Sequence, residues 1–306
     1  MYLTGPERQI QCARMEYPKN YQELNRRFAT EEACYDYLAA IRWPDGFICS
    51  DCGGKKYWRT NLRQWVCSEC RKKFRVLAGT LFQDTKLPLS LWFQMIWWFM
   101  GPKNGASALA LQQNFGVGSY KTCWKVLNKL RSCVVLASRS KLTGEVEVDQ
   151  AFLGRVNGKE IILIAAEKRG AATGRIRLKH VKAETAKEVQ GFILEAVELG
   201  SKIISDRHKS YHTIVEKGYA REAMKKPYSW EDVDGDDDRL LPRVGRVAAH
   251  MKRWYLGTYH GGMNIVEIQG YLDEFVFRYN RRTSRSRGLV FHRLVEAAVN
   301  SKPKPF

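Results

Sequence analysis

The chain has 306 residues, of which 44% are hydrophobic and 12% aromatic, and this composition excludes disorder as its main state. Lysine and arginine number 51 against 32 aspartates and glutamates, which gives a formal net charge of +19 and favours a polyanionic partner, nucleic acid first. The longest nearly apolar run, Leu91–Met100, is too short to cross a bilayer, and residues 1–20 have no signal-peptide core. We therefore expect a cytoplasmic protein of about two domains with no membrane partner.

Residues 1–45 are expected to form an N-terminal helical segment, and residues 46–78 a zinc ribbon. Two CxxC pairs lie in the second segment with fourteen residues between them. Four thiolates at this spacing can take the corners of a tetrahedron, as in a closed structural zinc site. Two disulfides fit poorly with a chain that lacks a secretory signal. The pattern predicts one structural Zn²⁺ bound by Cys49, Cys52, Cys67 and Cys70.

Basic and aromatic residues are interleaved through the ribbon, and this arrangement suits a phosphate backbone. Lys55, Lys56 and Arg63 are the predicted DNA contacts there. Alternatively, the ribbon only stabilises the fold.

A helix-turn-helix DNA-binding domain is predicted over residues 86–136. Apolar residues recur at three- and four-residue steps after residue 88, and a Gly-Pro break precedes two further helices, expected over 106–114 and 119–133. Two helices joined by a glycine turn are typical of this motif, although many helical hairpins share the pattern. The predicted DNA contacts near the start of the last helix are Tyr120, Lys121 and Lys125.

The segment that follows alternates between apolar and polar residues and predicts three strands, a helix and a fourth strand. Asp149 lies at the end of the first strand, and Asp206 ends the strand after the helix. This order predicts an α/β catalytic domain over residues 143–298, with an RNase H-like mixed sheet and helices. Two carboxylates at one sheet edge can bind Mg²⁺ or Mn²⁺ for phosphodiester chemistry. Alternatively, either aspartate is a turn residue.

Ordered motifs between about residues 30 and 298 resemble the insertion-sequence transposases of family fifteen-ninety-five. The resemblance implies a zinc ribbon, a helix-turn-helix and an acidic-triad domain that uses Mg²⁺ to cut and join DNA at element ends. It also implies that Asp149 and Asp206 occupy the first two metal-binding positions. The motifs are Phe74–Trp92, Gly105–Leu109, Ser119–Trp124, Glu145–Asp149, Ser205–Asp206, Leu256–Gly261 and Tyr271–Arg282.

The third metal-binding position departs from the family pattern. Members place Glu seven residues, or Asn two residues, before a lysine that Lys252 matches, but Gly245 and His250 stand at those positions. His250 is our preferred third ligand, with a softer nitrogen donor than Mg²⁺ prefers, unless its ring packs against Trp254. Glu274 is the other candidate, unless it forms ion pairs on a helix surface.

The last features are a basic run and an acidic run. Arg281 and Arg282 are predicted to contact the DNA backbone, and residues 231–238 to form an acidic loop. We expect a transposase that binds the terminal inverted repeats of an insertion sequence on double-stranded DNA, as a homo-oligomer, and catalyses Mg²⁺-dependent strand cleavage and strand transfer. The alternative is a catalytically impaired DNA-binding protein derived from such an enzyme. A zinc-ribbon transcription factor or RNA-binding protein would leave Asp149 and Asp206 unexplained.

Overall fold

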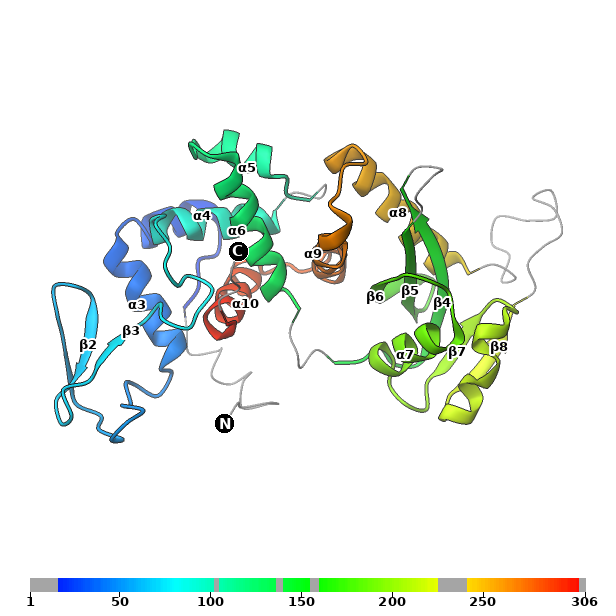
Figure 1. The fold of residues 1–306 in the computed structure, drawn as a ribbon, viewed down its shortest axis with the longest axis horizontal. Coiled ribbons are helices and arrows are strands. Elements are labelled where there is room, and N and C mark those ends of the chain that lie inside the picture. The colour runs from blue at the N-terminus through cyan, green and yellow to red at the C-terminus, as the bar shows by residue number, and fades with distance from the viewer. Residues whose placement is uncertain (1–15, 102–104, 136–139, 155–159, 225–240, 303–306) are drawn as a thin grey trace. The chain divides into compact units, whose positions relative to one another are not determined.

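The computed structural model describes residues 16–101, 105–135, 140–154, 160–224 and 241–302 (Figure 1). The chain divides into two compact units, one of Met1–Ser138 with Ser284–Phe306 and one of Arg139–Thr283. The predicted acidic loop at 231–238 lies outside the described residues. Within the described part, no helix is both long and apolar enough to span a membrane.

The first unit combines a small sheet with helices that share an aromatic core. The rings of Phe28 and Phe93 have centroids 4.8 Å apart, and those of Phe93 and Phe291 are 5.5 Å apart. The described helices are α2 (Tyr21–Arg27), α3 (Glu31–Arg42), α4 (Leu89–Met100), α5 (Ala108–Phe115), α6 (Tyr120–Cys133) and α10 (Arg287–Asn300).

Helix α10 lies in a different unit from the one that the sequence analysis expects. It packs against α3, α4 and α6, whereas the expected catalytic domain runs to residue 298. His292 of α10 is buried, and its Nδ1 lies 2.7 Å from the hydroxyl of Tyr37 on α3. Apolar periodicity identifies a helix and its buried face, but not the helices against which that face packs.

The small sheet consists of β1 (Tyr57–Arg59), β2 (Gln64–Cys67) and β3 (Lys73–Arg75), all antiparallel in the order β1-β2-β3. Two ion pairs connect it to α3, from Arg59 to Asp36 at 2.5 Å and from Arg63 to Glu32 at 2.9 Å. These ion pairs anchor the three-stranded sheet on the preceding helix.

The second unit is a mixed α/β domain around a five-stranded sheet of order β6-β5-β4-β7-β8. β4 pairs antiparallel with β5 and parallel with β7. One face packs against α7, and the other packs against α8 and α9. The elements are β4 (Glu145–Leu153), β5 (Glu160–Arg169), β6 (Ala172–Val181), α7 (Ala186–Ala196), β7 (Lys202–Ser205), the 3-10 helix η1 (Lys209–Lys217), β8 (Ala220–Ala223), α8 (Pro242–Tyr259), the 3-10 helix η3 (Ile265–Glu267) and α9 (Ile268–Asn280).

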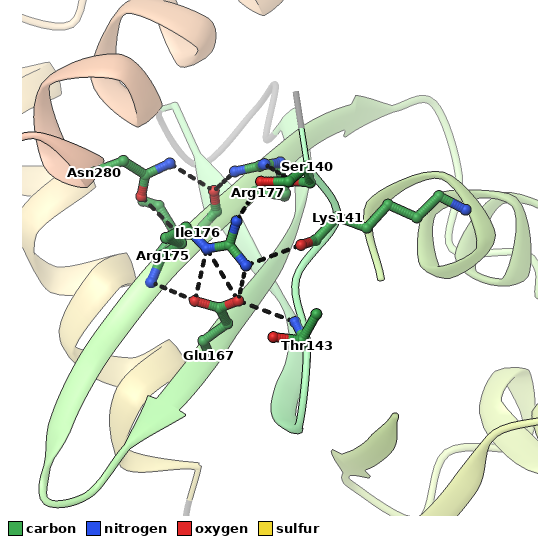
Figure 2. Close-up of polar contacts among 8 residues, drawn as sticks. All are labelled: Ser140, Lys141, Thr143, Glu167, Arg175, Ile176, Arg177 and Asn280. Carbon is green, nitrogen blue, oxygen red and sulfur yellow. Dashed lines mark hydrogen bonds and ion pairs between the residues drawn. The ribbon is translucent and has the colours of Figure 1, made fainter. Parts of the chain in front are cut away.

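A buried carboxylate holds the segment that leads into β4 (Figure 2). Glu167 on β5 accepts hydrogen bonds from the backbone N–H of Thr143 at 3.0 Å and from Nε of Arg175 at 2.9 Å. Arg175 also donates to the carbonyl oxygen of Lys141 at 2.9 Å. Because Glu167 is 5% exposed, this carboxylate is shielded from water, and its hydrogen bonds fix the segment that leads into β4.

Polar side chains also attach both helices of the second face to the sheet. Glu147 on β4 accepts from the backbone N–H groups of Arg243 and Val244, at 2.7 and 3.0 Å, so that a buried carboxylate caps the positive end of α8. At the end of α9, the Asn280 amide bonds to both the backbone N–H and the carbonyl oxygen of Ile176 on β6, as Figure 2 shows.

We predict that Glu167→Gln lowers the free energy of unfolding by about 3 kcal/mol, because it leaves the Arg175 guanidinium without its buried counter-charge. Urea denaturation measures this loss. The matched control is Glu195→Gln, which removes an exposed ion pair with Lys179 and should change stability by less than about 0.5 kcal/mol. Equal losses in the two variants would contradict the assignment.

The same carboxylate predicts a pH dependence. Burial raises the pKa of Glu167, but the hydrogen bonds from Arg175 and Thr143 outweigh burial and hold the pKa below its ordinary value of 4.5. The stabilisation is therefore complete above about pH 5 and is lost as the pH falls through the folded-state pKa.

Candidate functional site

Asp149 lies in the middle of β4, not at its end as expected, and Asp206 follows the last residue of β7, which pairs parallel with β4. The register pairs Glu147 with Ile204, two residues before each aspartate. Because side chains alternate along a strand, Asp149 faces the same side of the sheet as Glu147, which is the side of α8. Asp206 is 9% exposed, just beyond the last residue of β7.

Asp206 also stabilises a turn, which was the alternative role expected for either aspartate. Its Oδ1 accepts the backbone N–H of His208 at 3.0 Å, which shapes the turn between β7 and η1. Oδ1 of Asp149 accepts the backbone N–H of Gln150 at 2.9 Å. A backbone amide thus orients each carboxylate.

Glu184 is a third acid near Asp149 and Asp206, and the sequence alone did not indicate it. The three acids are related through Tyr211. Tyr211 is fully buried, and its hydroxyl has no hydrogen-bond partner among the described residues. Burial raises the pKa of Tyr211, and the charges of Asp149, Asp206 and Glu184 raise it further. Oε1 of Glu184 lies 3.3 Å from Nδ1 of His208. Glu184 stands in a loop 22 positions before Asp206, so no local pattern connects the two.

His250, our preferred third ligand, lies among cations on the exposed side of α8. Its Nδ1 accepts a hydrogen bond from Nη2 of Arg253 at 3.0 Å. Burial, then the charges of Arg253, Arg246 and Arg282, lower the pKa of His250. A further cation would be repelled there. The His250 ring lies against Tyr279, with centroids 6.4 Å apart. Lys252 is exposed on the same helix.

Glu274, the other candidate, is fully buried in α9 rather than on a helix surface. Its Oε1 accepts from Nε and Nη2 of Arg278, at 3.0 and 2.8 Å. The two residues are spaced i, i+4 on α9, as in an ion pair on a helix surface. Here, however, the Glu274 carboxylate is buried in the core of the unit. Arg281, a predicted DNA contact, stacks on Phe277 with its guanidinium carbon 4.1 Å from the ring centroid.

The four ribbon cysteines form a compact cluster at the ends of β1 and β2. Their sulfurs all lie within 4.8 Å of one another, and none forms a disulfide. Sγ of Cys49 lies 3.5 Å from that of Cys70, and the same distance separates Cys52 from Cys67. Zinc–sulfur bonds of about 2.3 Å in a tetrahedron require a separation of about 3.8 Å. The cluster therefore fits a structural zinc.

Both CxxC turns share one backbone pattern, which explains how they present their thiols. The N–H of Gly53 bonds to the carbonyl oxygen of Cys49 at 2.9 Å, and that of Arg71 to Cys67 at 3.1 Å. Gly53 and Arg71 both have left-handed φ angles, of 75° and 63°. Burial disfavours the Cys49 thiolate, but the backbone N–H groups of Cys52 and Asp51 outweigh it and lower the pKa of Cys49 to about 7.

The predicted DNA contacts of the first unit differ in their surroundings. Lys55, Lys56, Tyr120 and Lys121 are exposed, and Lys125 is partly exposed on the same helix as Tyr120. The guanidinium of Arg63 instead donates to Glu32 from both Nε and Nη2, at 3.1 and 2.9 Å, and this pair helps to anchor the ribbon on α3.

Arg282 is fixed by the second unit. It donates to the carbonyl oxygens of Thr173 and Gly174, and its guanidinium carbon lies 4.0 Å from the Tyr279 ring centroid. Its backbone partners lie more than 100 positions earlier in the chain, so the basic run alone could not reveal them.

Two family models match the chain. The transposase zinc-ribbon domain matches residues 29–73, and the ISXO2-like transposase domain matches residues 141–280. Together they cover more than half of the sequence, and both are domains of the same insertion-sequence transposases that the sequence motifs resemble. The chain belongs to this transposase family.

Individual proteins are more distant. An uncharacterized protein in transposable element ISH50 of Halobacterium salinarum is 26% identical over 132 residues, which cover 42% of this chain and 44% of the relative. The chain therefore spans less than half of that relative's length. A chain of the simian T-cell lymphotropic virus intasome in complex with PP2A regulatory subunit B56 gamma is 13% identical, with a TM-score of 0.32, and the match covers 55% of this chain and 63% of that one.

We predict one zinc ion per chain, because so short a ribbon has little apolar surface with which to fold without metal. Elemental analysis of the purified protein measures the stoichiometry. Cys49→Ser combined with Cys52→Ser should remove the zinc and lower DNA affinity, whereas Cys123→Ser, in a helix of the same unit, should retain it. Protein without zinc, or DNA binding unchanged in the double variant, would contradict this prediction.

Proposed function

We propose that the chain is a DNA transposase that binds the terminal inverted repeats of its element and cuts and joins DNA strands. The observation that carries the proposal is the parallel pairing of β4, which contains Asp149, with β7, which Asp206 follows directly. Membership of the transposase family supports the same activity. Paired carboxylates at such a site are suited to phosphodiester chemistry with divalent cations.

The strand order supports an RNase H-like fold for the second unit. Three antiparallel strands, β4 to β6, are followed by α7 and by β7, which returns parallel to the central strand β4. This order puts the first strand beside the fourth, so that residues far apart in sequence meet at the ends of neighbouring strands.

Asp149 and Asp206 would hold the catalytic Mg²⁺ or Mn²⁺, because both cations prefer carboxylate oxygens. The bound cation supplies Lewis acidity and polarises phosphate oxygens. The backbone amides of Gln150 and His208 keep the two carboxylates in place. Neither His250 nor Glu274 has surroundings suited to a cation. Among the described residues, Glu184 is the acid whose charge, like those of Asp149 and Asp206, raises the pKa of Tyr211, so it is the candidate third carboxylate. In this structure the three carboxylates do not form a metal-binding group.

The first unit would bind the element ends. α5 and α6 pack together as two helices joined by a short turn, and Gly116 ends α5 in the left-handed conformation. The exposed start of α6 carries Tyr120 and Lys121, which suits a recognition helix that contacts double-stranded DNA. Lys55 and Lys56 on the ribbon would add phosphate contacts. A homo-oligomer would align two element ends.

A second candidate is a DNA-binding protein of the same family that no longer cleaves. The observation that favours it is the composition of α8, where Gly245 and His250 replace the family's acid or amide and no aspartate or glutamate is present. A Cβ at Gly245 would meet no atom within 4 Å, so an acid there would fit sterically. Strand cleavage distinguishes the two candidates.

We predict that Asp149→Asn or Asp206→Asn lowers cleavage of a fragment with the element's own ends by at least about a thousandfold, since each change removes an anionic ligand. End binding, measured by gel shift, should stay within about twofold, because the binding contacts lie elsewhere. Glu216→Gln, an exposed acid of η1, is the control and should cleave normally. Full activity in either Asp→Asn variant would sink the catalytic assignment.

We also predict that DNA affinity falls with salt, and that the fall depends on the start of α6. The slope of log K against log salt is negative, and each lost phosphate contact makes it shallower by about 0.9. Lys121→Ala with Lys125→Ala should therefore make the slope shallower by about 1.8. Lys182→Ala with Lys187→Ala removes the same charge near α7 and should leave the slope unchanged. The same slope in both double variants would exclude α6 as the DNA contact.

A further inference from the structure

Three arginines gather around His250 on the face of the second unit that α8 covers. Arg246, His250 and Arg253 follow one another at four- and three-residue steps, so they share one side of the helix. Arg282, just beyond α9, joins them through Tyr279, whose ring contacts both Arg282 and His250. We call these three arginines with His250 the α8 arginine cluster.

No carboxylate pairs with Arg246, Arg253 or Arg282 among the described residues, and α8 contains no acidic residue at all. An ordinary solvated helix face has charges of both signs, because like charges brought together repel. Elsewhere in this unit, Arg175, Arg243 and Arg278 each have a glutamate partner. The α8 arginine cluster is therefore an uncompensated concentration of positive charge.

The cluster is also held in place before any ligand binds. Arg282 is fixed by backbone carbonyl oxygens of β6, and Nη1 of Arg246 donates to the hydroxyl of Thr173 at 3.1 Å. Arg253 donates to the imidazole of His250. The lowered pKa of His250 keeps this imidazole neutral near pH 7, so that it accepts the hydrogen bond without adding charge. Ordered guanidinium groups lose little freedom when they bind an anion.

We propose that the α8 arginine cluster binds the phosphodiester backbone of DNA on the second unit. The inference rests on the proposed function, because it places the strand near the sheet face on which Asp149 lies. Guanidinium groups match phosphate oxygens in a two-point geometry, whereas a metal ion would be repelled. The position that supplies a metal ligand in other family members is, in this chain, a DNA contact.

The test compares two double variants of the full-length, zinc-loaded protein. Arg246→Gln with Arg253→Gln removes two of the three positive charges of the cluster and keeps Arg282, whose guanidinium donates to backbone carbonyl oxygens of β6. The control, Lys182→Gln with Lys187→Gln, makes the same charge change on exposed residues near α7. Affinity for a duplex of the element end is measured at several salt concentrations, and thermal unfolding is recorded for each protein.

We expect the arginine variant to bind at least about tenfold more weakly, with a salt slope reduced by about 1.8, and the control to match the wild type. The melting temperature of the arginine variant should be unchanged or higher, because repulsion between guanidinium groups is relieved. A lower melting temperature with unchanged affinity would show a structural role and overturn the proposal. If the variant does not fold, His250→Arg, which adds charge to the cluster, should tighten binding, and weaker or equal binding would overturn the proposal.

The outcomes also separate this inference from the proposed function. If the arginine variant binds like the control while Lys121→Ala with Lys125→Ala loses affinity, the cluster is not a DNA contact but the transposase proposal stands. If the wild-type protein shows no salt-dependent affinity for the duplex, both proposals fail.

Discussion

Parallel pairing between β4 and β7 decides where the two aspartates lie, and several buried contacts of the second unit hold those strands. β4 is the central strand and bonds to β5 on one side and β7 on the other. Glu167 and Arg175 fix the segment that enters β4, and Glu147 ties the strand to the first turn of α8. Since a shift of one residue would turn Asp149 to the opposite face, this register is the condition for any shared cation site.

Acidic residues are scarce in so basic a chain, and the structure divides those of the second unit between two tasks. Glu147, Glu167 and Glu274 are buried, and each is bound by one arginine of its own neighbourhood. These charges stabilise the fold. Asp149, Asp206 and Glu184 instead act together on the buried Tyr211 hydroxyl. α8 contains basic but no acidic residues, so the second unit separates the acids around Tyr211 from the arginines of α8.

Local sequence patterns predicted the elements of this protein better than their partners. Cysteine spacing identified the four-thiolate cluster, and alternation with strand order identified a mixed sheet with Asp206 directly after a strand. Asp149, expected at the end of the first strand, lies in the middle of β4 because that strand continues to Leu153. Contacts between residues that are far apart in the sequence could not be predicted, because no sequence period or spacing encodes them. The packing of α10 in the first unit, the Arg63–Glu32 pair and the approach of Glu184 to His208 are of this kind. The arginine surroundings of His250 are of the same kind, because Arg282 lies 32 positions away in the sequence.

The central claim is that Asp149 and Asp206 share a divalent cation. Crystals of the full chain grown with Mn²⁺ test it most directly, by anomalous diffraction at the manganese absorption edge. The account predicts an anomalous peak about 2.1 Å from a carboxylate oxygen of each aspartate. Manganese bound beside His250, or carboxylates of Asp149 and Asp206 that point to opposite faces of the sheet, would contradict it.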